Sequence, residues 1–331
     1  GNEAIALGAV QAGLNMYIAY PMTPASAILH YLAEHEDDLG VVTIHPESEI
    51  GVALMALGAV YAGAKTMVGT SGGGFALMTE ALSLSGQGEF PIVFVMVQRP
   101  GPSTGVPTYT MQGDLSFVIN SGHGEFLKVV LAPGNVEEAF YLTGLAMNLA
   151  WKFQIPCFVL SDKHVSESIF SFEADLKKVK PEDPLLWDGQ GEYKRYLDTQ
   201  NGISPLAFPG NSKAIVKVTS YEHDEYGITT EESEQIVRMQ QKRLRKKKTL
   251  EDELEIMPIE RAGEFLEMAA TLVRIKAQLL LPRPEQPDWE EDPRAELVRR
   301  LLEYEHFQDV VHVLEGAEAK RGRHFAKGYI E

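Results

Sequence analysis

The fold class is decided by one continuous apolar stretch, Pro91-Ile92-Val93-Phe94-Val95-Met96-Val97. Strands of a parallel sheet are covered on both faces, so their sequences stay apolar instead of alternating. Other short apolar runs that predict strands lie at residues 16–20, 66–69 and 155–160. Helical patterns lie between them at residues 2–13, 50–62, 75–85 and 136–153. Strands and helices that alternate at this spacing predict an α/β fold with a largely parallel sheet.

The bulk composition excludes several classes of function. A chain of 331 residues is long enough for about two domains. The formal net charge of −17 disfavours nucleic acid and anionic membrane surfaces as partners. No apolar run approaches the roughly 20 residues that a membrane-spanning helix needs, and the sequence does not start like a signal peptide. We therefore expect neither a nucleic-acid nor a membrane partner.

The single cysteine, Cys157, limits the redox chemistry. One thiol cannot form an internal disulfide, which agrees with a cytoplasmic protein. One thiol also cannot hold an iron–sulfur cluster, so electron transfer would have to end on another subunit. The surrounding apolar residues predict that Cys157 lies in a buried strand. Three histidines, His45, His123 and His164, lack metal-ligand spacing, so no metal site is expected.

The rest of the chain changes character twice. Residues 171–250 are polar and rich in Gly and Pro, which predicts an extended, loop-rich arm and linker. The basic run at 242–248 is more typical of a solvated face or linker than of nucleic-acid binding. Residues 251–331 contain two amphipathic patterns, at 258–281 and 297–314, which predict a separate all-helical segment. The first pattern stops at Pro282-Arg283-Pro284.

The first candidate motif is Tyr20-Pro21-Met22-Thr23-Pro24-Ala25-Ser26, which follows a predicted strand. The two prolines restrict the backbone and hold Thr23 in an extended geometry. A hydroxyl held rigidly at the end of a strand is well placed to touch a ligand. The alternative is a rigid turn in which Thr23 or Ser26 caps the next helix.

Two further motifs open predicted helices. Glu47 and Glu49 stand at the start of a helix of small apolar residues. Acidic residues there commonly complement the helix dipole, but one of them could be buried against a ligand. The turn Gly69-Thr70-Ser71-Gly72-Gly73-Gly74 lets the backbone approach a ligand closely. It lacks the Lys-Ser/Thr ending of a P-loop, so nucleotide hydrolysis is not expected.

A long loop follows the apolar stretch that decides the fold. It runs from Gln98 to Thr108 and leads into Gln112-Gly113-Asp114. The carboxyl edge of a parallel sheet is where open α/β proteins bind ligands, and long loops there are usually functional. Arg99 could bind a ligand at this edge, or it could pair with a neighbouring carboxylate.

Together these motifs resemble the alpha subunit of 2-oxoacid:ferredoxin oxidoreductases over about residues 1–245. The resemblance is carried by Gly1-Asn2-Glu3-Ala4, Tyr20-Pro21-Met22-Thr23-Pro24, Glu49-Ile50, Thr70-Ser71-Gly72-Gly73-Gly74, residues 98–105, Gln112-Gly113-Asp114 and residues 221–227. It implies that residues 1–170 form a thiamine-diphosphate-binding domain of the pyrimidine type. It also implies a beta subunit that carries the diphosphate site, Mg²⁺ and an iron–sulfur cluster, and possible partnership with a gamma subunit or domain.

The resemblance also implies roles for individual residues. Glu49 would be catalytic, through a hydrogen bond to the pyrimidine ring, and Thr23 would contact the reacting centre. The remaining cofactor contacts would come from Tyr20, Pro21, Ser71, Gly72 and Gly73. Substrate contacts would come from Thr23, Arg99, Thr108 and Tyr109.

The implied reaction is oxidative decarboxylation of a 2-oxoacid to an acyl-coenzyme A, with ferredoxin as electron acceptor. Activity is expected to need the partner subunit. Tyr109 stands where 2-oxoglutarate members of the family tend to have Arg, so a preference for a dicarboxylate is not implied.

The C-terminal segment resembles a different protein. Over about residues 255–320 it is similar to segregation and condensation protein A, a bacterial kleisin, and the similarity is carried by residues 262–277, 281–283 and 292–298. This resemblance implies a condensin-type partner. Three interpretations remain open from the sequence: an enzyme subunit, a chromosome-segregation adaptor, and a non-functional chimera of the two.

Overall fold

A six-stranded, all-parallel sheet lies at the centre of the computed structural model, which describes residues 1–254. Its spatial order is β2-β1-β3-β4-β6-β5. The strands are β1 (Met16–Ile18), β2 (Val42–Ile44), β3 (Thr66–Thr70), β4 (Val93–Gln98), β5 (Val129–Leu131) and β6 (Cys157–Asp162). The predicted α/β fold with a largely parallel sheet is confirmed.

The three central strands explain the apolar runs in the sequence. Every residue of β3, β4 and β6 is buried, because helices cover both faces of the sheet. Strands β4 and β6 run in register from Val93 beside Cys157 to Gln98 beside Asp162. The carboxyl ends of these two strands therefore place Gln98 and Asp162 side by side.

The sequence patterns did not predict β2 and β5. Each has three residues with mixed burial and lies at an edge of the sheet. Because they are only partly buried, they lack the long apolar runs of β4 and β6, and pairing with a neighbouring strand defines them.

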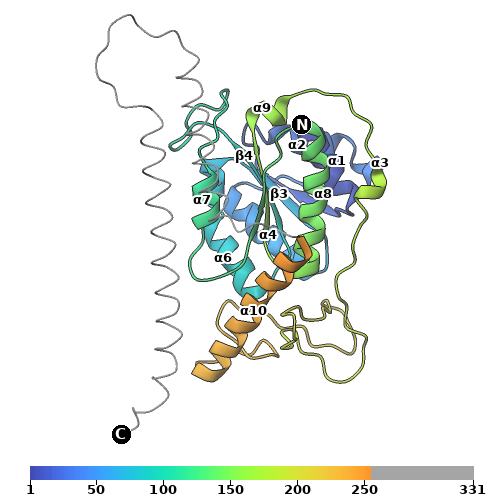
Figure 1. Cartoon of the computed structure of the whole chain (residues 1–331), viewed down its shortest axis with the longest axis vertical. Coiled ribbons are helices and arrows are strands. Elements are labelled where there is room, and N and C mark those ends of the chain that lie inside the picture. The colour runs from blue at the N-terminus through green and yellow to red at the C-terminus, as the bar shows by residue number, and fades with distance from the viewer. Residues whose placement is uncertain (255–331) are drawn as a thin grey trace, which may run out of the picture. The chain divides into compact units, whose positions relative to one another are not determined.

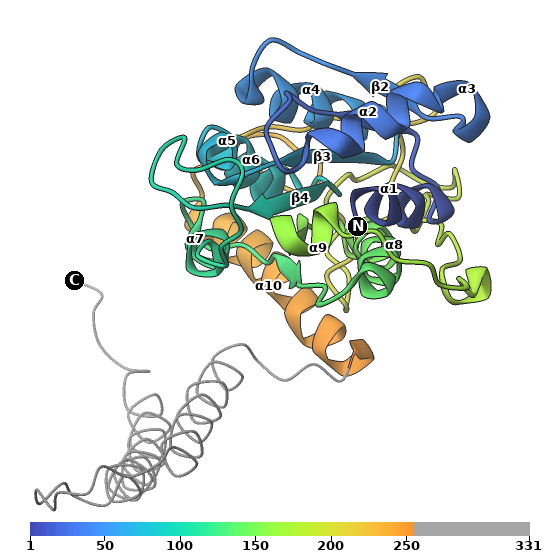
Figure 2. The same ribbon diagram turned by 90° about the horizontal axis from the view of Figure 1, so that it is seen from above.

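Helices cover the two faces of the sheet (Figures 1 and 2). One face carries α1 (Asn2–Gln11), α2 (Ser26–Glu34) and α8 (Val136–Phe153). The other carries α4 (Glu49–Tyr61), α6 (Thr79–Gly88) and α7 (Leu115–Asn120). The remaining short helices are α3 (Glu36–Leu39), α5 (Gly72–Ala76), α9 (Lys163–Glu167) and the 3₁₀ helix Leu176–Lys178.

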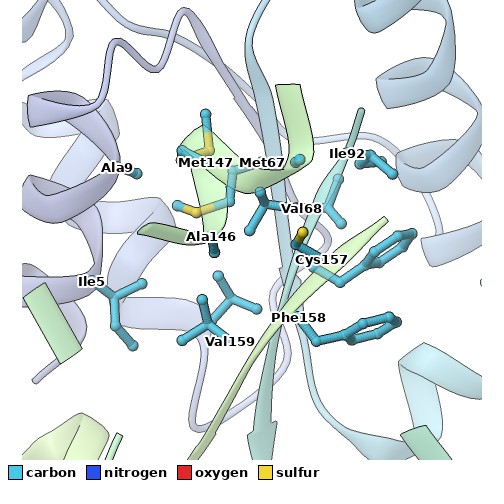
Figure 3. Packing of buried hydrophobic residues seen from close by; sticks show 14 of the residues in the cluster. Ile5, Ala9, Met67, Val68, Ile92, Ala146, Met147, Cys157, Phe158 and Val159 are labelled. Atoms are coloured by element: carbon cyan, nitrogen blue, oxygen red, sulfur yellow. The ribbon is translucent and has the colours of Figure 1, made fainter. Parts of the chain in front are cut away.

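The core lies between α1, α8 and the sheet, where small residues allow close packing. Figure 3 shows Ile5 of α1 and Ala146 of α8 beside Cys157 and Val159 of β6. A Cβ on Gly8 would lie 2.1 Å from the carbonyl oxygen of Phe140, so only glycine fits where α1 crosses α8. Cys157 is fully buried and forms no disulfide, in agreement with its predicted place in a buried strand.

The arm is largely loop between α9 and residue 232, and it ends in the long helix α10 (Ser233–Leu254). Figure 1 shows α10 in orange near the carboxyl-terminal end of α6. The prediction that the basic run forms a solvated face or linker is wrong. Lys242, Arg243 and Lys246 are buried on α10, while Lys247 and Lys248 face outward.

The ends of two helices explain this burial. Glu89 follows α6 and Gln154 follows α8, both with left-handed backbone. Lys242 binds the Glu89 carboxylate, Lys246 binds Glu89 and the Gln154 carbonyl oxygen, and Arg195 donates to the Glu89 carbonyl oxygen at 2.8 Å. The carboxyl-terminal end of a helix is partially negative, so two helix ends and one carboxylate together favour the buried cations. We call Glu89, Arg195, Lys242 and Lys246 the Glu89 cluster.

The helices predicted at residues 258–281 and 297–314 fall outside the described residues. Of the predicted helical segment 251–331, the structure describes only residues 251–254, which end α10. Within residues 1–254, no helix is both long enough and apolar enough to span a membrane.

Candidate functional site

Four of the sequence motifs meet at the carboxyl edge of the sheet. Residues 20–24 follow β1, residues 71–74 follow β3, and residues 99–114 follow β4. Glu49, at the start of α4, lies among them, because α4 runs back from this edge to reach β3. Strands in a parallel sheet end at the same edge, so motifs far apart in the sequence come together there.

Glu49 has the environment of a ligand-binding group. It is 5% exposed, and its Oε1 has no hydrogen-bond partner among the described residues. Glu47, by contrast, is exposed. A helix dipole is satisfied by an exposed acid, whereas a buried polar atom without a partner is unfavourable by a few kcal/mol. The structure therefore favours Glu49 over Glu47 as the group that faces a ligand.

The glycine turn packs against this carboxylate. A Cβ on Gly74 would lie 2.7 Å from Oε1 of Glu49 and 2.2 Å from Oγ1 of Thr70. A side chain there would force Thr70 and Glu49 to shift, so glycine at position 74 allows the close packing seen here. The hydroxyl of Ser71 is also buried without a partner. The segment 71–74 thus presents backbone and unpaired polar groups beside Glu49.

Arg99 is held at the end of β4 by a backbone contact. Its Nη1 donates a 2.6 Å hydrogen bond to the carbonyl oxygen of Thr23, and the side chain is 8% exposed. No ion pair of Arg99 occurs within residues 1–254. Burial lowers the pKa of its guanidinium, and the nearby Glu49 carboxylate opposes that effect. The alternative in which Arg99 simply pairs with a carboxylate is wrong for the described part of the chain.

A cavity of about 430 Å³ opens beside Arg99. The start of the long loop forms one wall, and the glycine turn forms another. The cavity is lined by Met22, Gly72, Gly73, Ala76, residues 99–104, Asp114 and Phe117. Arg99 is the cation and Asp114 the acid in this lining, so a small anionic ligand would bind on the Arg99 side of the cavity.

Not every predicted residue lies in this cavity. Thr23 is exposed and contributes its backbone oxygen to Arg99. Helix α2 begins at Ser26 and its N-cap is Ala25, which makes no side-chain capping bond, so the capping alternative is wrong. Tyr20 is partly exposed and its ring meets His45 edge-on, with centroids 5.8 Å apart. Pro21 is half-buried.

Two predicted substrate contacts lie away from the cavity. Thr108 and Tyr109 are exposed in the distal part of the loop, and neither lines the cavity with Arg99. Tyr109 is 67% exposed. In this structure the loop therefore separates these side chains from Arg99.

Two acidic residues at the site were not among the predicted site residues. Asp114 has a buried Oδ2 without a partner, burial raises the pKa of its carboxyl, and it lines the cavity. Asp162, at the end of β6, accepts a 2.6 Å hydrogen bond from Nε2 of Gln112. One sequence feature could have identified Asp162: it follows a predicted buried strand, at the same edge of the sheet as the other motifs.

His45, His123 and His164 are all exposed. Across residues 1–254, no three His, Cys, Asp or Glu side chains form a group that could hold a metal ion.

Comparison with known proteins identifies the family of the chain. The family model for pyruvate flavodoxin/ferredoxin oxidoreductase, thiamine-diphosphate-binding, matches residues 7–242. The chain belongs to this family. A second model, segregation and condensation protein ScpA, matches residues 235–331. The two matches overlap on α10, at residues 235–242.

Relatives and a solved structure agree with the family. The chain is 38% identical over 270 residues to 2-oxoacid:ferredoxin oxidoreductase 1, subunit alpha, of Sulfurisphaera tokodaii, covering 77% of this chain and 43% of the relative. It is 34% identical over 256 residues to 2-oxoglutarate synthase subunit KorA of Methanocaldococcus jannaschii, covering 75% and 68%. A solved structure also matches, with a TM-score of 0.72 and 38% identity over 76% of this chain and 44% of the other chain. It is the 2-oxoglutarate:ferredoxin oxidoreductase from Magnetococcus marinus with 2-oxoglutarate, coenzyme A and succinyl-CoA bound. The chain thus spans less than half the length of several relatives that it matches.

Proposed function

We propose that this chain is part of the alpha subunit of a 2-oxoacid:ferredoxin oxidoreductase, where it forms the aminopyrimidine side of a thiamine diphosphate site. One observation carries the proposal. The buried Oε1 of Glu49 has no partner within the described residues, at the sheet edge where the family motifs meet. Family membership supplies the chemical context for that oxygen.

The residues around Glu49 fit the pyrimidine ring. A carboxylate with a free oxygen can accept a hydrogen bond from a protonated ring nitrogen, which holds the proton at N1′ of the cofactor. Residues 72–74 let the ring come close, because a side chain at Gly74 would reach Glu49 itself. When bound, thiamine diphosphate supplies the chemistry of decarboxylation, and the protein orients it and sets its protonation.

Arg99 is proposed to bind the carboxylate of the 2-oxoacid. It faces the cavity from a buried position and is oriented by the carbonyl oxygen of Thr23. A guanidinium and a carboxylate form strong, directional hydrogen bonds. Thr23 would then lie next to the substrate, while contacts from Thr108 and Tyr109 would require the distal loop to move.

The other half of the site is proposed to come from a beta subunit. The described residues contain no group of acidic, His or Cys side chains suited to Mg²⁺, and the chain has one cysteine. The diphosphate, Mg²⁺ and an iron–sulfur cluster would therefore lie on the partner, which passes electrons to ferredoxin. Coenzyme A would accept the acyl group, and a gamma subunit or domain would complete the assembly. This chemistry and the single thiol favour a cytoplasmic location.

The test is reconstitution of the chain with the beta subunit of a relative. Glu49→Gln should lower 2-oxoacid-dependent reduction of ferredoxin by at least about 10²-fold, as expected for lost proton-transfer catalysis. Glu47→Gln is the matched control, because Glu47 is exposed two residues away. Normal turnover in Glu49→Gln together with loss in Glu47→Gln would transfer the role to Glu47.

A second candidate function rests on the ScpA match. We propose it only for residues beyond α10, because residues 235–254 of that match lie on a helix packed against the α/β domain. Copurification of the full chain with a condensin-type ATPase would support an adaptor role. If no such complex forms, the adaptor role is excluded, and the enzyme-subunit function remains for a chain that is either a single functional unit or a chimera.

A further inference from the structure

We propose that Asp162 is a positioning residue that holds the loop of residues 99–114 over the cavity by binding Gln112. The geometry of the two residues carries the structural part of this proposal. Its effect on turnover rests on the proposed function.

Both carboxylate oxygens of Asp162 are engaged. Asp162 ends β6 and is 6% exposed. Its Oδ1 accepts a 2.9 Å hydrogen bond from the backbone N–H of Val165, which caps α9. Its Oδ2 accepts the 2.6 Å bond from Nε2 of Gln112. Helix capping needs only one oxygen, so it does not account for the bond to Gln112.

The loop has few other attachments. Residues 101–113 are exposed except for the half-buried Pro107. Two hydrogen bonds are internal to the loop region, from Val106 to Pro100 and from Tyr109 to Val106. Within residues 1–254, the bond from Gln112 to Asp162 is the hydrogen bond that ties this exposed segment to the rest of the chain.

The returning end of the loop is fixed beside this bond. The backbone N–H of Asp114 donates to Oε1 of Gln98 at 2.9 Å. Gln98 and Asp162 are register partners on β4 and β6. Two neighbouring strand ends therefore hold two points of the loop, Gln112 and Asp114. Of the two, only Gln112 lies within the exposed segment of residues 101–113.

The bond matters because the loop is part of the cavity wall. Residues 100–104 line the cavity next to Arg99. A hydrogen bond to a buried carboxylate is stronger than one between neutral groups, because one partner is charged. Without it, a glycine-rich exposed segment gains conformational freedom, and the wall beside Arg99 is formed only part of the time. Substrate affinity should then fall more than the rate of the bound complex.

The variants separate the bond from the helix cap. Asp162→Ser keeps one oxygen, and serine is a good capping residue, so α9 should survive while the bond to Gln112 is lost. Gln112→Ala removes the same bond from the other side without touching the cap. Thr110→Ala is the matched control, because Thr110 is exposed in the same loop and makes no hydrogen bond to the described residues.

The first measurement does not depend on activity. Spin labels at Val106→Cys in the loop and His30→Cys on α2 report the loop position, since both sites are exposed and the native Cys157 is buried. Gln112→Ala and Asp162→Ser should each broaden the distance distribution at least about two-fold, and Thr110→Ala should not. An unchanged distribution in both variants would overturn the proposal.

The second measurement uses the reconstituted complex. Either variant should raise KM for the 2-oxoacid about 10-fold, which corresponds to loss of one charge-assisted hydrogen bond, with kcat changed less than about three-fold. The double variant should be no worse than either single one, because both remove one interaction. Fully additive effects on KM would refute the pairing. If the unmodified complex turns over no 2-oxoacid, the proposed function fails, and the label distances still decide the role of Asp162.

Discussion

Lys242 Nζ lies 2.7 Å from Oε1 and 2.9 Å from Oε2 of Glu89, and both side chains are almost completely buried. The two residues are 153 positions apart in the sequence. Lys246 also binds Glu89, one helical turn further along α10. This contact attaches α10 to the amino edge of the sheet, opposite the candidate site, because Glu89 lies just before β4.

Breaking the Glu89 cluster should destabilise the α/β domain. Glu89→Gln leaves Lys242 and Lys246 buried without a carboxylate. Loss of one partner of a buried pair typically lowers the free energy of unfolding by about 3–5 kcal/mol. Lys246→Met should lower the free energy of unfolding less, because it removes one buried cation and leaves Lys242 paired with Glu89. Urea unfolding of the full chain, followed by circular dichroism, measures both variants.

The control for the cluster is Lys248→Met, which removes the same charge from the exposed side of the same helix. Its unfolding free energy should stay within about 0.5 kcal/mol of the unmodified chain. Equal effects of Lys246→Met and Lys248→Met would show that net charge, and not the buried contact, controls stability.

The stability of the domain should depend on pH through His223. This side chain is buried against the Tyr196 ring, and burial, with help from Arg243 and Lys242, lowers its pKa to about 4, although Glu89 and Glu222 act the other way. The pKa in the folded state is below the ordinary value, so above about pH 6.5 His223 is neutral in both states and its titration does not reduce stability. As the pH falls from 6.5 towards 4, the unfolded chain binds a proton that the folded protein does not. The free energy of unfolding should therefore fall by up to about 3 kcal/mol.

His223→Phe removes this titration and keeps an aromatic ring in the same space. The difference in unfolding free energy between the variant and the unmodified chain should shift in favour of the variant as the pH falls from 6.5 to 4. Measured at half-unit steps, a constant difference across that window would mean that His223 is not buried in its neutral form.

Gly74→Ala should damage the site and the local packing together. The new methyl group would lie 2.7 Å from Oε1 of Glu49 and 2.2 Å from Oγ1 of Thr70. Overpacking of this kind typically costs about 1–3 kcal/mol of stability, and displacement of Glu49 should abolish turnover in the reconstituted complex. Gly58→Ala is the control, since it lies in α4 with no atom within 4 Å of the new Cβ. It should fold at least as stably as the unmodified chain and keep full activity.

Arg99→Lys tests the proposed carboxylate contact. Lysine keeps the charge but loses the planar pair of donors, and its shorter reach would also release the Thr23 carbonyl oxygen. KM for the 2-oxoacid should rise about 10- to 100-fold, as expected when a charge-assisted pair is lost. Arg238→Lys on the exposed face of α10 should leave KM unchanged. A normal KM in Arg99→Lys would remove Arg99 from the substrate site.

Much of the candidate site could be predicted because its residues lie on local patterns. Residues 20–24, 71–74 and 99–114 each follow a strand whose apolar run is visible in the sequence. Parallel strands end at a common edge, so the patterns imply that these segments meet. The family resemblance pointed to Glu49, but the local pattern of two acids at the start of a helix did not decide between Glu47 and Glu49. In the fold, Glu47 stays exposed before the N-cap Ser48, whereas Glu49 is buried beside Gly74.

The sequence by itself determined the α/β class, the parallel sheet and the edge where the motifs gather, because strand and helix periods are local properties. The tertiary structure alone decided the edge strands β2 and β5, the engagement of Asp162 by Gln112, and the burial of Lys242 and Lys246. A lysine in a basic run has the same local pattern whether water or a carboxylate surrounds it. Only the fold brings Glu89 and the ends of α6 and α8 to these lysines, and those distant groups supply the charge that makes burial favourable.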